Sequence, residues 1–270
     1  MIPTILRYFA ISSLTCTALA TTSLAQADLT ARDIVAKVIS QSESKYFSAD
    51  VTMDLIDGSG NKRQRLFKLR SLNKDGYRAS LSNFTKPFDV KNTGFLTINQ
   101  DAKPDASGRW MYIPSVGKTK KIPQAESHKK FMASDFSYAD LEQIKLDRNR
   151  YKILKTLDMN GEATWAIEVI PADQAEAERS GYKKSVLYVN QKRFTVTRSA
   201  HWLNGGKNVK LMRVLKEENI GGKWLATKVK MTSKSGKKTL HQTIISFDAV
   251  DTKTPLADSF FTTRRLEKGH

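Results

Sequence analysis

The spacing of hydrophobic and polar residues changes once along this chain, near residue 50. Over residues 31–44, apolar side chains recur every three to four positions, which is typical of one face of an α-helix. These side chains are Ile34, Val35, Val38 and Ile39. Thr30 and Asp33 have the spacing of a capping box that would start this helix. Residues 51–57 then alternate between apolar and polar, as a half-buried β-strand does.

Turns rich in Asn, Asp and Gly follow at short intervals and separate further runs with strand character. Asn-Gly pairs are typical of tight hairpins because they tolerate positive φ angles. The runs are 65–72, 77–83, 93–99, 109–114, 151–159, 164–171, 184–189, 194–203, 209–217, 224–232 and 239–247. The pattern predicts a mainly β (α+β) fold, an incomplete antiparallel β-barrel or strongly curved sheet of about a dozen strands.

Many of these strands carry apolar residues on one face and charged residues on the other. In the run 209–217 we expect Val209, Leu211 and Leu215 to form the apolar face and Lys210 to lie opposite, although the alternation is imperfect. One face of the sheet is therefore expected to meet water. Two segments interrupt the strands, a basic loop over 117–143 and a polar, acidic insert over 172–181, and both are candidate lids.

The start of the chain has the character of an export signal. Arg7 is the one charged residue before an apolar run over 8–20, and small residues lead up to Ala27. An uncleaved anchor is the alternative, but the run is shorter than the ~20 strongly apolar residues that a membrane span needs. We predict that 1–27 is a cleaved signal peptide and 28–270 is a single domain, located in the periplasm of a bacterial cell.

Charge and cysteine content limit the candidate functions. The chain has 45 basic and 27 acidic residues, and removal of the leader takes only Arg7 from this balance. Cys16, the only cysteine, lies in the leader, so we expect no disulfide, thiol nucleophile or thiolate metal site in the mature chain. We also expect no cofactor, and the His spacing suggests no metal site. For an exported protein, the basic surplus favours transient contact with an anionic membrane surface over nucleic acid.

Two aromatic residues on one strand are candidates for an apolar pocket. Trp110 and Tyr112 share a strand face by their spacing, and Pro114 ends the strand. Either they line a binding cavity or they belong to an ordinary core. The following run, Lys118, Lys120 and Lys121, lacks the spacing of a phosphate loop. It is either a solvated strand face or a site that steers anionic head groups or an acidic partner.

The segment 131–141 has the most distinctive sequence. Ser137 and Asp140 form a possible capping box for a short helix that continues through Ile144. The apolar side chains beside this box are Phe131, Phe136, Tyr138 and Leu141. Such a helix either plugs the mouth of a barrel or is pinned to the surface of the sheet.

A hydrolase is a further alternative, because Ser134, Asp135 and His128 include the residue types of a serine nucleophile and its base. The sequence lacks the Gly-x-Ser-x-Gly elbow, and His128 stands next to two lysines in a loop. We therefore expect no catalytic residues.

Four blocks, taken in order, resemble the LolA-like family of outer-membrane lipoprotein-sorting proteins. They are Pro87-Phe88-Asp89-Val90-Lys91, Thr93-Gly94-Phe95-Leu96, Trp110-Met111-Tyr112-Ile113-Pro114 and Ser134-Asp135-Phe136-Ser137-Tyr138-Ala139-Asp140-Leu141. The chain departs from the family pattern at Ala133 and Asn92, where family members usually have Gly, and at Ala139, which replaces a common acidic residue.

The resemblance implies a half-barrel whose helices cover the concave face and enclose a hydrophobic cavity. It implies a periplasmic carrier of lipid or lipidated protein, with a transporter of the resistance-nodulation-division (RND) type as a possible partner, and we expect a monomer. The alternative is an envelope sensor or a transporter accessory subunit that binds protein. Candidate lid residues are Trp110, Tyr112, Phe131, Phe136, Tyr138 and Leu141. Candidate lining residues are Val51, Met53, Leu55, Phe67, Leu69, Phe95 and Leu96. Pro114, Ser134, Asp135, Ser137 and Asp140 are expected to be structural.

Overall fold

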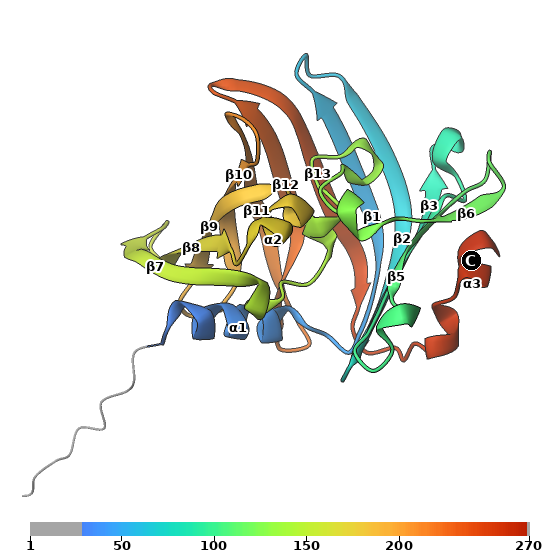
Figure 1. Cartoon of the computed structure of the whole chain (residues 1–270), viewed down its shortest axis with the longest axis horizontal. Helices are drawn as coiled ribbons and strands as arrows, with labels where there is room; N and C mark the ends of the chain where they lie inside the picture. The colour runs from blue at the N-terminus through green and yellow to red at the C-terminus, as the bar shows by residue number, and fades with distance from the viewer. Residues whose placement is uncertain (1–28, 269–270) are drawn as a thin grey trace, which may run out of the picture.

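A single antiparallel sheet of 13 strands dominates the computed structural model, which describes residues 29–268 (Figure 1). The strand order is β6-β5-β4-β3-β2-β1-β13-β12-β11-β10-β9-β8-β7, so β6 and β7 are the two free edges. The sheet curves strongly without closing, which confirms the predicted incomplete barrel. The predicted signal peptide lies outside the described residues.

Each predicted strand corresponds to an observed one, and β6 is the additional strand, where the basic run had suggested a solvated strand face. The strands are β1 (Tyr46–Asp57), β2 (Lys62–Lys74), β3 (Tyr77–Lys86), β4 (Gly94–Gln100), β5 (Gly108–Ile113), β6 (Lys118–Lys121), β7 (Asn149–Asp158), β8 (Ala163–Pro171), β9 (Tyr182–Asn190), β10 (Val196–Leu203), β11 (Asn208–Ile220), β12 (Lys223–Ser235) and β13 (Lys238–Asp251). The helices are α1 (Ala31–Ser42), α2 (Gln174–Ser180) and α3 (Thr263–Lys268). None of these helices is long and apolar enough to cross a membrane.

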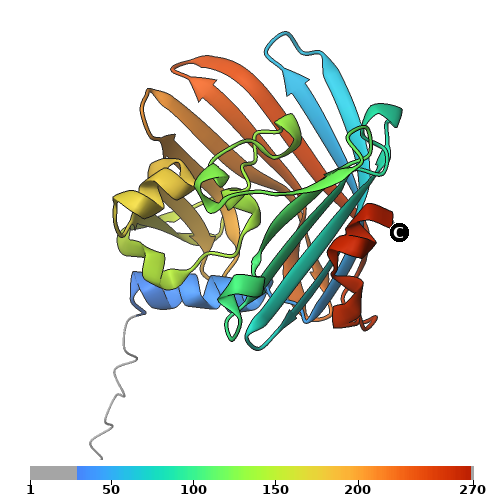
Figure 2. The same cartoon turned by 45° about the vertical axis from the view of Figure 1, so that its right-hand side comes forward.

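Short 3₁₀ turns punctuate the connections. They are η1 (Phe88–Val90), η2 (Pro104–Ala106), η3 (Gln124–Glu126), η4 (Phe131–Ala133), η5 (Ala139–Leu141), η6 (Leu146–Arg148) and η7 (Asp258–Phe260). Four of them, η3, η4, η5 and η6, fall in the long connection between β6 and β7, which enters the half-barrel (Figure 2).

Strand pairing determines which side chains share the concave face. Thr243 on β13 pairs with Leu55 on one side and Met231 on the other, and Met231 pairs with Met212. Paired residues point to the same side of a sheet, so these four lie on one face. The main buried cluster on this face is Ala49, Val51, Met53, Leu55, Phe67, Phe84, Val90, Phe95, Ile122, Phe131, Phe136, Tyr138, Met231 and Ile245.

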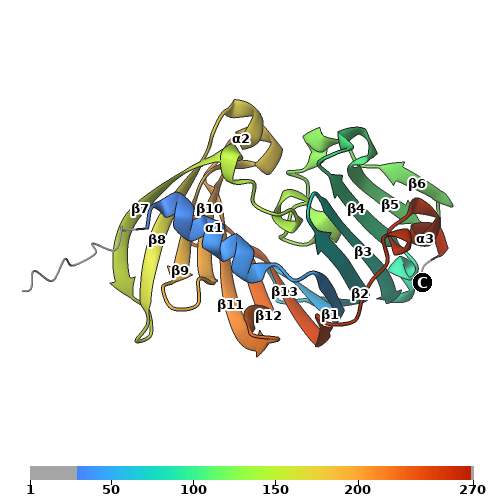
Figure 3. The ribbon, with the colours of Figure 1, turned by 90° about the horizontal axis from the view of Figure 1, so that it is seen from below.

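Helix α1 covers part of the same concave face. Its capping box is present as predicted, because Thr30 Oγ1 accepts from Asp33 N and the Asp33 carboxylate accepts from Thr30 N. Ile34 and Val35 are fully buried against β8 and β9, in a cluster that includes Ile167. Figure 3 shows α1 lying across these strands inside the half-barrel. The helix therefore closes one end of the concave face with its apolar stripe.

On β11 the prediction of which residues face the interior is wrong. Lys210 and Met212 point to the concave side, and Lys210 is only 6% exposed. Leu211 and Leu215, which were expected in the interior, are 39% and 42% exposed. The sequence prediction fails here because a residue far away in the chain compensates the charge of Lys210, as described below.

The convex face carries a cover of its own that the sequence did not predict. Helix α3 packs across β4, β5 and β6 on the outside of the sheet (Figure 3). Beneath α3, Leu266 and Phe261 are buried with Trp110, Tyr112 and Leu96. These last three were expected in the cavity, and that placement is corrected. Residues alternate along a strand, so Met111, between the two aromatic residues, is the one on the concave side.

Gly94 sets the distance between α3 and the sheet. A Cβ atom at this position would lie 2.4 Å from Leu266 Cδ1 and 3.1 Å from the Leu266 carbonyl oxygen. We therefore expect Gly94→Ala to push α3 outward and to lower the free energy of unfolding by about 1–3 kcal/mol, measured by urea denaturation. Gly206→Ala is the control, because its nearest added contact would be 3.9 Å away. Equal stability of the two variants would contradict this packing.

Candidate functional site: a plugged half-barrel

Residues 127–141, called the plug here, lie against the concave face of the sheet (Figure 2). The Phe131 ring lies 5.2 Å from the Phe95 ring and 6.2 Å from the Phe84 ring, and the Tyr138 ring lies 5.4 Å from Phe95, between centroids. Phe136 is buried in the same cluster. Of the two arrangements expected for this segment, the structure has the one in which it fills part of the half-barrel.

The predicted helix after Ser137 is reduced to the single turn η5. The reciprocal bonds of the capping box are present, from Ser137 N to Asp140 Oδ2 at 2.7 Å and from Asp140 N to Ser137 Oγ at 3.2 Å. The backbone becomes extended at Glu142 instead of continuing to Ile144. The expected helix is therefore wrong in length, and Glu142, where the chain leaves the helical path, forms the ion pairs described below.

Asp135 fastens the middle of the plug to β12 and β13. Its carboxylate is fully buried and accepts from Ser233 Oγ at 2.6 Å and from Thr243 Oγ1 at 2.7 Å. His241 Nδ1 lies 2.7 Å from the same carboxylate. The Asp135 backbone N–H in turn donates to Thr243 Oγ1. A buried carboxylate is stable only when its oxygens are bonded, so these contacts hold the plug in one position.

Asp140 fastens the end of the plug to β9 and β11. Tyr182 donates its phenolic O–H to Asp140 Oδ1 at 2.7 Å, and Lys210 Nζ lies 3.2 Å from Oδ2. Burial by itself would raise the pKa of Asp140, but the Lys210 ammonium and the bonds from Ser137 and Tyr182 outweigh it, so the pKa lies below its ordinary value. The carboxylate is therefore charged at neutral pH and neutralises a buried lysine.

A neutral histidine lies beneath this ion pair. His201 stacks on the Tyr182 ring at 4.7 Å, and its two ring nitrogens each lie 2.7 Å from a serine hydroxyl, Ser185 at Nδ1 and Ser199 at Nε2. Burial lowers the pKa of His201 to about 4, and the nearby Lys210 charge acts in the same direction while Asp140 opposes it. His201 is thus uncharged at neutral pH and serves as a polar packing element.

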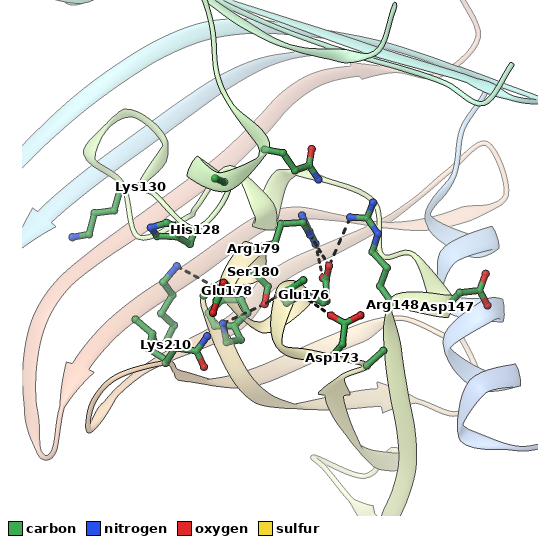
Figure 4. A pocket seen from close by; sticks show the side chains of 18 residues that line it. His128, Lys130, Asp147, Arg148, Asp173, Glu176, Glu178, Arg179, Ser180 and Lys210 are labelled. Carbon is green, nitrogen blue, oxygen red and sulfur yellow. Dashed lines mark hydrogen bonds and ion pairs between the residues drawn. The ribbon is translucent and has the colours of Figure 1, made fainter. Parts of the chain in front are cut away.

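Ion pairs link the two sides of the half-barrel through Glu142. Its carboxylate lies 2.7 Å from Arg109 Nη1 on β5 and 2.8 Å from Arg179 Nη1 on α2. Arg179 also binds Glu176 at 2.6 Å, and Arg148 lies 3.7 Å from Glu176 (Figure 4). The residue after the plug therefore connects β5 to α2, the helix between β8 and β9, and these strands are distant from β5 in the sheet order.

A partly apolar cavity remains between the plug, the end of α1 and strands β1 to β4. Its volume is about 420 Å³. Of the predicted residues, those that line it are Phe67, Leu69, Phe95, Phe131 and Leu141. Val51, Met53, Leu55, Phe136 and Tyr138 are buried in the adjoining cluster beneath and within the plug. The cavity extends from the middle of β2 to the ends of β2 and β4 at Asn73 and Asn99.

A second, larger pocket of about 930 Å³ lies between the plug and α2 (Figure 4). Most of the residues that line it are polar or charged, among them His128, Lys130, Glu178, Arg179 and Lys210, although carbon atoms make up most of the exposed wall. The acidic insert predicted as a candidate lid forms α2 in this wall, capped by Asp173 and ended by Gly181 in the left-handed conformation. Arg179 and Lys210 in this wall are paired with carboxylates, Arg179 with Glu142 and Glu176 and Lys210 with Asp140.

The predicted basic and structural residues are distributed as follows. Lys118, Lys120 and Lys121 form the edge strand β6, near the hairpin tips, and Lys121 lies over the Trp110 ring on the convex side. They do not line either pocket. Pro114 follows β5 directly, as expected. The lysines are therefore separated from the apolar cavity.

The serine and histidine of the hydrolase alternative are not brought together. Ser134 is fully buried, and its hydroxyl bonds only within its own turn, to the Phe136 carbonyl and N–H at 3.2 Å. His128 is exposed at the polar pocket. Within residues 29–268, no group of three or more His, Cys, Asp or Glu side chains is arranged to hold a metal ion.

The profile of a family described only as "Uncharacterized protein" matches residues 76–268. The chain belongs to this family. Its fold is the LolA-like fold, as three solved structures show. A domain from Vibrio parahaemolyticus, described as outer-membrane lipoprotein-sorting, has a TM-score of 0.78 and 24% identity over 88% of this chain and 98% of that one. No curated protein matches the sequence.

The other two structures support the same conclusion about the fold. A DUF1329 family protein from Desulfovibrio piger has a TM-score of 0.77 and 22% identity over 87% of this chain and 97% of that one. A LolA superfamily protein from Nitrosomonas europaea has a TM-score of 0.67 and 17% identity over 88% and 99%. At these identities the likeness concerns the fold alone.

The two departures at positions where the LolA-like pattern has glycine fall on left-handed backbone. Asn92 has a φ of 65° and Ala133 a φ of 58°. Glycine adopts such angles without steric cost, asparagine tolerates them, and alanine adopts them at a cost of about 1–2 kcal/mol. The plug therefore keeps its backbone path at Ala133 although the residue is unfavourable there.

Sequence reasoning missed the partners of the two plug carboxylates. They are Tyr182, Lys210, Ser233, His241 and Thr243, together with Arg109 and Arg179 around Glu142. Polar residues at strand positions that face the interior would have indicated these partners. The sequence alone does not say which face of each strand is the interior one.

We expect Asp140→Ala to lower the free energy of unfolding by about 3–5 kcal/mol, because it leaves Lys210 buried without a counter-charge. Adding Lys210→Met should recover at least ~1 kcal/mol relative to the sum of the two single changes, measured by urea denaturation. Lys62→Met is the control, because the Lys62 side chain is 52% exposed beside its partner Asp54, and it should cost less than ~1 kcal/mol. Strict additivity would contradict the coupling.

His201 makes stability depend on pH in a defined window. Its pKa is 6.5 in the unfolded chain and about 4 in the folded one, so the unfolded state binds more protons between these values. Stability should therefore fall by up to about 3 kcal/mol as pH drops from 6.5 to 4. The lowered pKa of Asp140 acts only below its ordinary 3.8, outside this window. His201→Gln should flatten the dependence, and an unchanged slope would refute the assignment.

Proposed function

We propose that this protein is a carrier that holds the acyl chains of lipid or lipidated protein without covalent chemistry. The observation that supports this most directly is the cavity of about 420 Å³ between the plug and the concave face. Its volume lies within the range of small-molecule sites, and Phe67, Leu69 and Phe95 give it an apolar wall.

Burial alone can hold such a cargo. Each methylene group removed from water contributes about 0.8 kcal/mol, so an acyl chain in this cavity is retained without a polar anchor. Leu141 lies at the opening and is 43% exposed, which makes it a contact for the part of the cargo outside. Release then requires an acceptor that competes for the chain or a shift of the plug.

The plug gives the carrier a means of enlarging its cavity. Phe131 belongs both to the cavity wall and to the plug, so displacing the plug would extend the apolar space toward Phe84 and Val51 on the sheet. The bonds of Asp135 and Asp140 oppose this movement. A longer or branched cargo would need to supply enough burial to offset their loss.

The proposal includes the wider setting expected from the sequence. The chain acts in the periplasm as a monomer of one domain, residues 28–270, after its leader is removed, and it passes cargo across the envelope with an inner-membrane transporter of the RND type as partner. The LolA-like fold and the basic, cysteine-free mature chain support this setting.

Lipid extraction tests the proposal directly. The mature chain is purified from its own envelope and denatured, and the co-extracted lipids are identified by mass spectrometry. The expected result is acyl lipid or lipopeptide near one per chain. An empty protein that also fails to take up a fluorescent fatty acid would overturn the carrier function.

A charge placed in the cavity should remove binding without unfolding the protein. Leu69 is only partly buried and points into the cavity, so Leu69→Asp should weaken binding of a fluorescent fatty acid at least about tenfold by exposing the cargo to a carboxylate. Leu211→Asp on the outer face is the matched control and should leave affinity unchanged. Equal affinity of both variants would place the site elsewhere.

A further inference from the structure

Five strand connections at one end of the sheet carry a concentrated positive charge. Because the strands are antiparallel and joined mostly as hairpins, residues 57–63, 86–91, 114–121, 204–207 and 234–238 all lie at this end, which is called the basic rim here. Together these five connections contain eleven Lys or Arg residues and only two Asp residues. All eleven except Lys234 are exposed.

One aromatic side chain projects from the basic rim. Phe88 is 94% exposed, at the tip of the connection between β3 and β4. The backbone beneath it is well held, with Phe84 N donating to the Thr93 carbonyl at 2.9 Å and Asn92 N to the Phe84 carbonyl at 2.8 Å. Val90, two residues on, is buried in the core. The ring is therefore presented to solvent by a structured turn.

A second apolar side chain lies on the neighbouring hairpin. Val116 is 61% exposed in the turn between β5 and β6. This turn and η1 lie side by side in Figures 1 and 2, above α3. Lys86 and Lys91 flank Phe88 in the sequence, and Lys118 follows Val116. Each apolar tip thus stands among lysines.

We propose that the basic rim docks on the surface of an anionic lipid bilayer, with Phe88 and Val116 entering the head-group region. Lysines beside a bilayer are attracted to lipid phosphates, each strengthening binding about fivefold, while an aromatic ring is stabilised at the interface. Isolated apolar tips surrounded by lysines suit this environment. A protein partner would instead be expected to meet a continuous apolar patch with a polar border.

The position of the basic rim is independent of the cavity. The cavity reaches Asn73 and Asn99, at the ends of β2 and β4 away from the hairpin tips that form the rim. Docking through the rim therefore leaves the cavity opening accessible. Membrane binding and acyl-chain binding are consequently separate properties that can be lost one at a time.

Vesicle binding tests the proposal. The chain from residue 28 onward is sedimented with vesicles of phosphatidylcholine alone or mixed with phosphatidylglycerol, at low and high salt. Binding should require phosphatidylglycerol and weaken at high salt. Phe88→Ser should reduce partitioning about tenfold, and Lys86→Gln with Lys91→Gln about twenty-five-fold. The matched controls are Leu154→Ser and the pair Lys152→Gln with Lys155→Gln, on the opposite edge strand β7, and they should bind as the unaltered chain does.

A fluorescent label locates the inserted residue. The chain from residue 28 has no cysteine, so Phe88→Cys and Leu154→Cys each accept one environment-sensitive dye. On anionic vesicles, emission should shift to the blue and be quenched by lipid-borne nitroxide only at position 88. Equal binding to neutral vesicles, or quenching equal at both positions, overturns the proposal. Retention on immobilised polyglutamate without any vesicle binding also overturns the proposal, because the basic rim would then be a protein-docking surface.

Discussion

The arrangement of the interior depends on two buried carboxylates that hold a loop inside an open sheet. An isolated charge costs several kcal/mol to bury, so Asp135 and Asp140 are stable in the half-barrel only with their partners in place. Those partners come from β9, β11, β12 and β13, strands that follow the plug by more than 40 residues in the sequence. The position of the plug and the conformation of the sheet are therefore coupled.

This coupling explains why an open sheet retains a cavity. The plug supplies Phe131, Phe136 and Tyr138 to the core, which removes much of the concave face from water. It does not reach the strand ends beside α1, and the space left there is apolar on one side. Its polar bonds are directional and limit further collapse, so the interior is divided into a filled part and an open part.

The two faces of the sheet have different tasks. Helix α1 and the plug cover the concave side, while α3 covers the convex side of β4 and β5, at the close approach that Gly94 permits. The hairpin tips beyond both covers carry the basic charge and Phe88. The molecule thus separates an apolar interior from a charged end, and each can contact a different part of its surroundings.

The sequence by itself determined the helix at residue 31, the strands and their hairpins, because caps, alternation and turn residues act over a few neighbours. It also singled out residues 134–141 as a distinctive block. Only the tertiary structure decided which strand face is covered and by what. Trp110 and Met111 alternate in the sequence, yet a distant helix, α3, determines that Trp110 packs outside. Lys210 looks solvent-facing until Asp140, 70 residues earlier, is brought beside it. Alternation distinguishes two faces, but burial is assigned by segments that are remote in the chain.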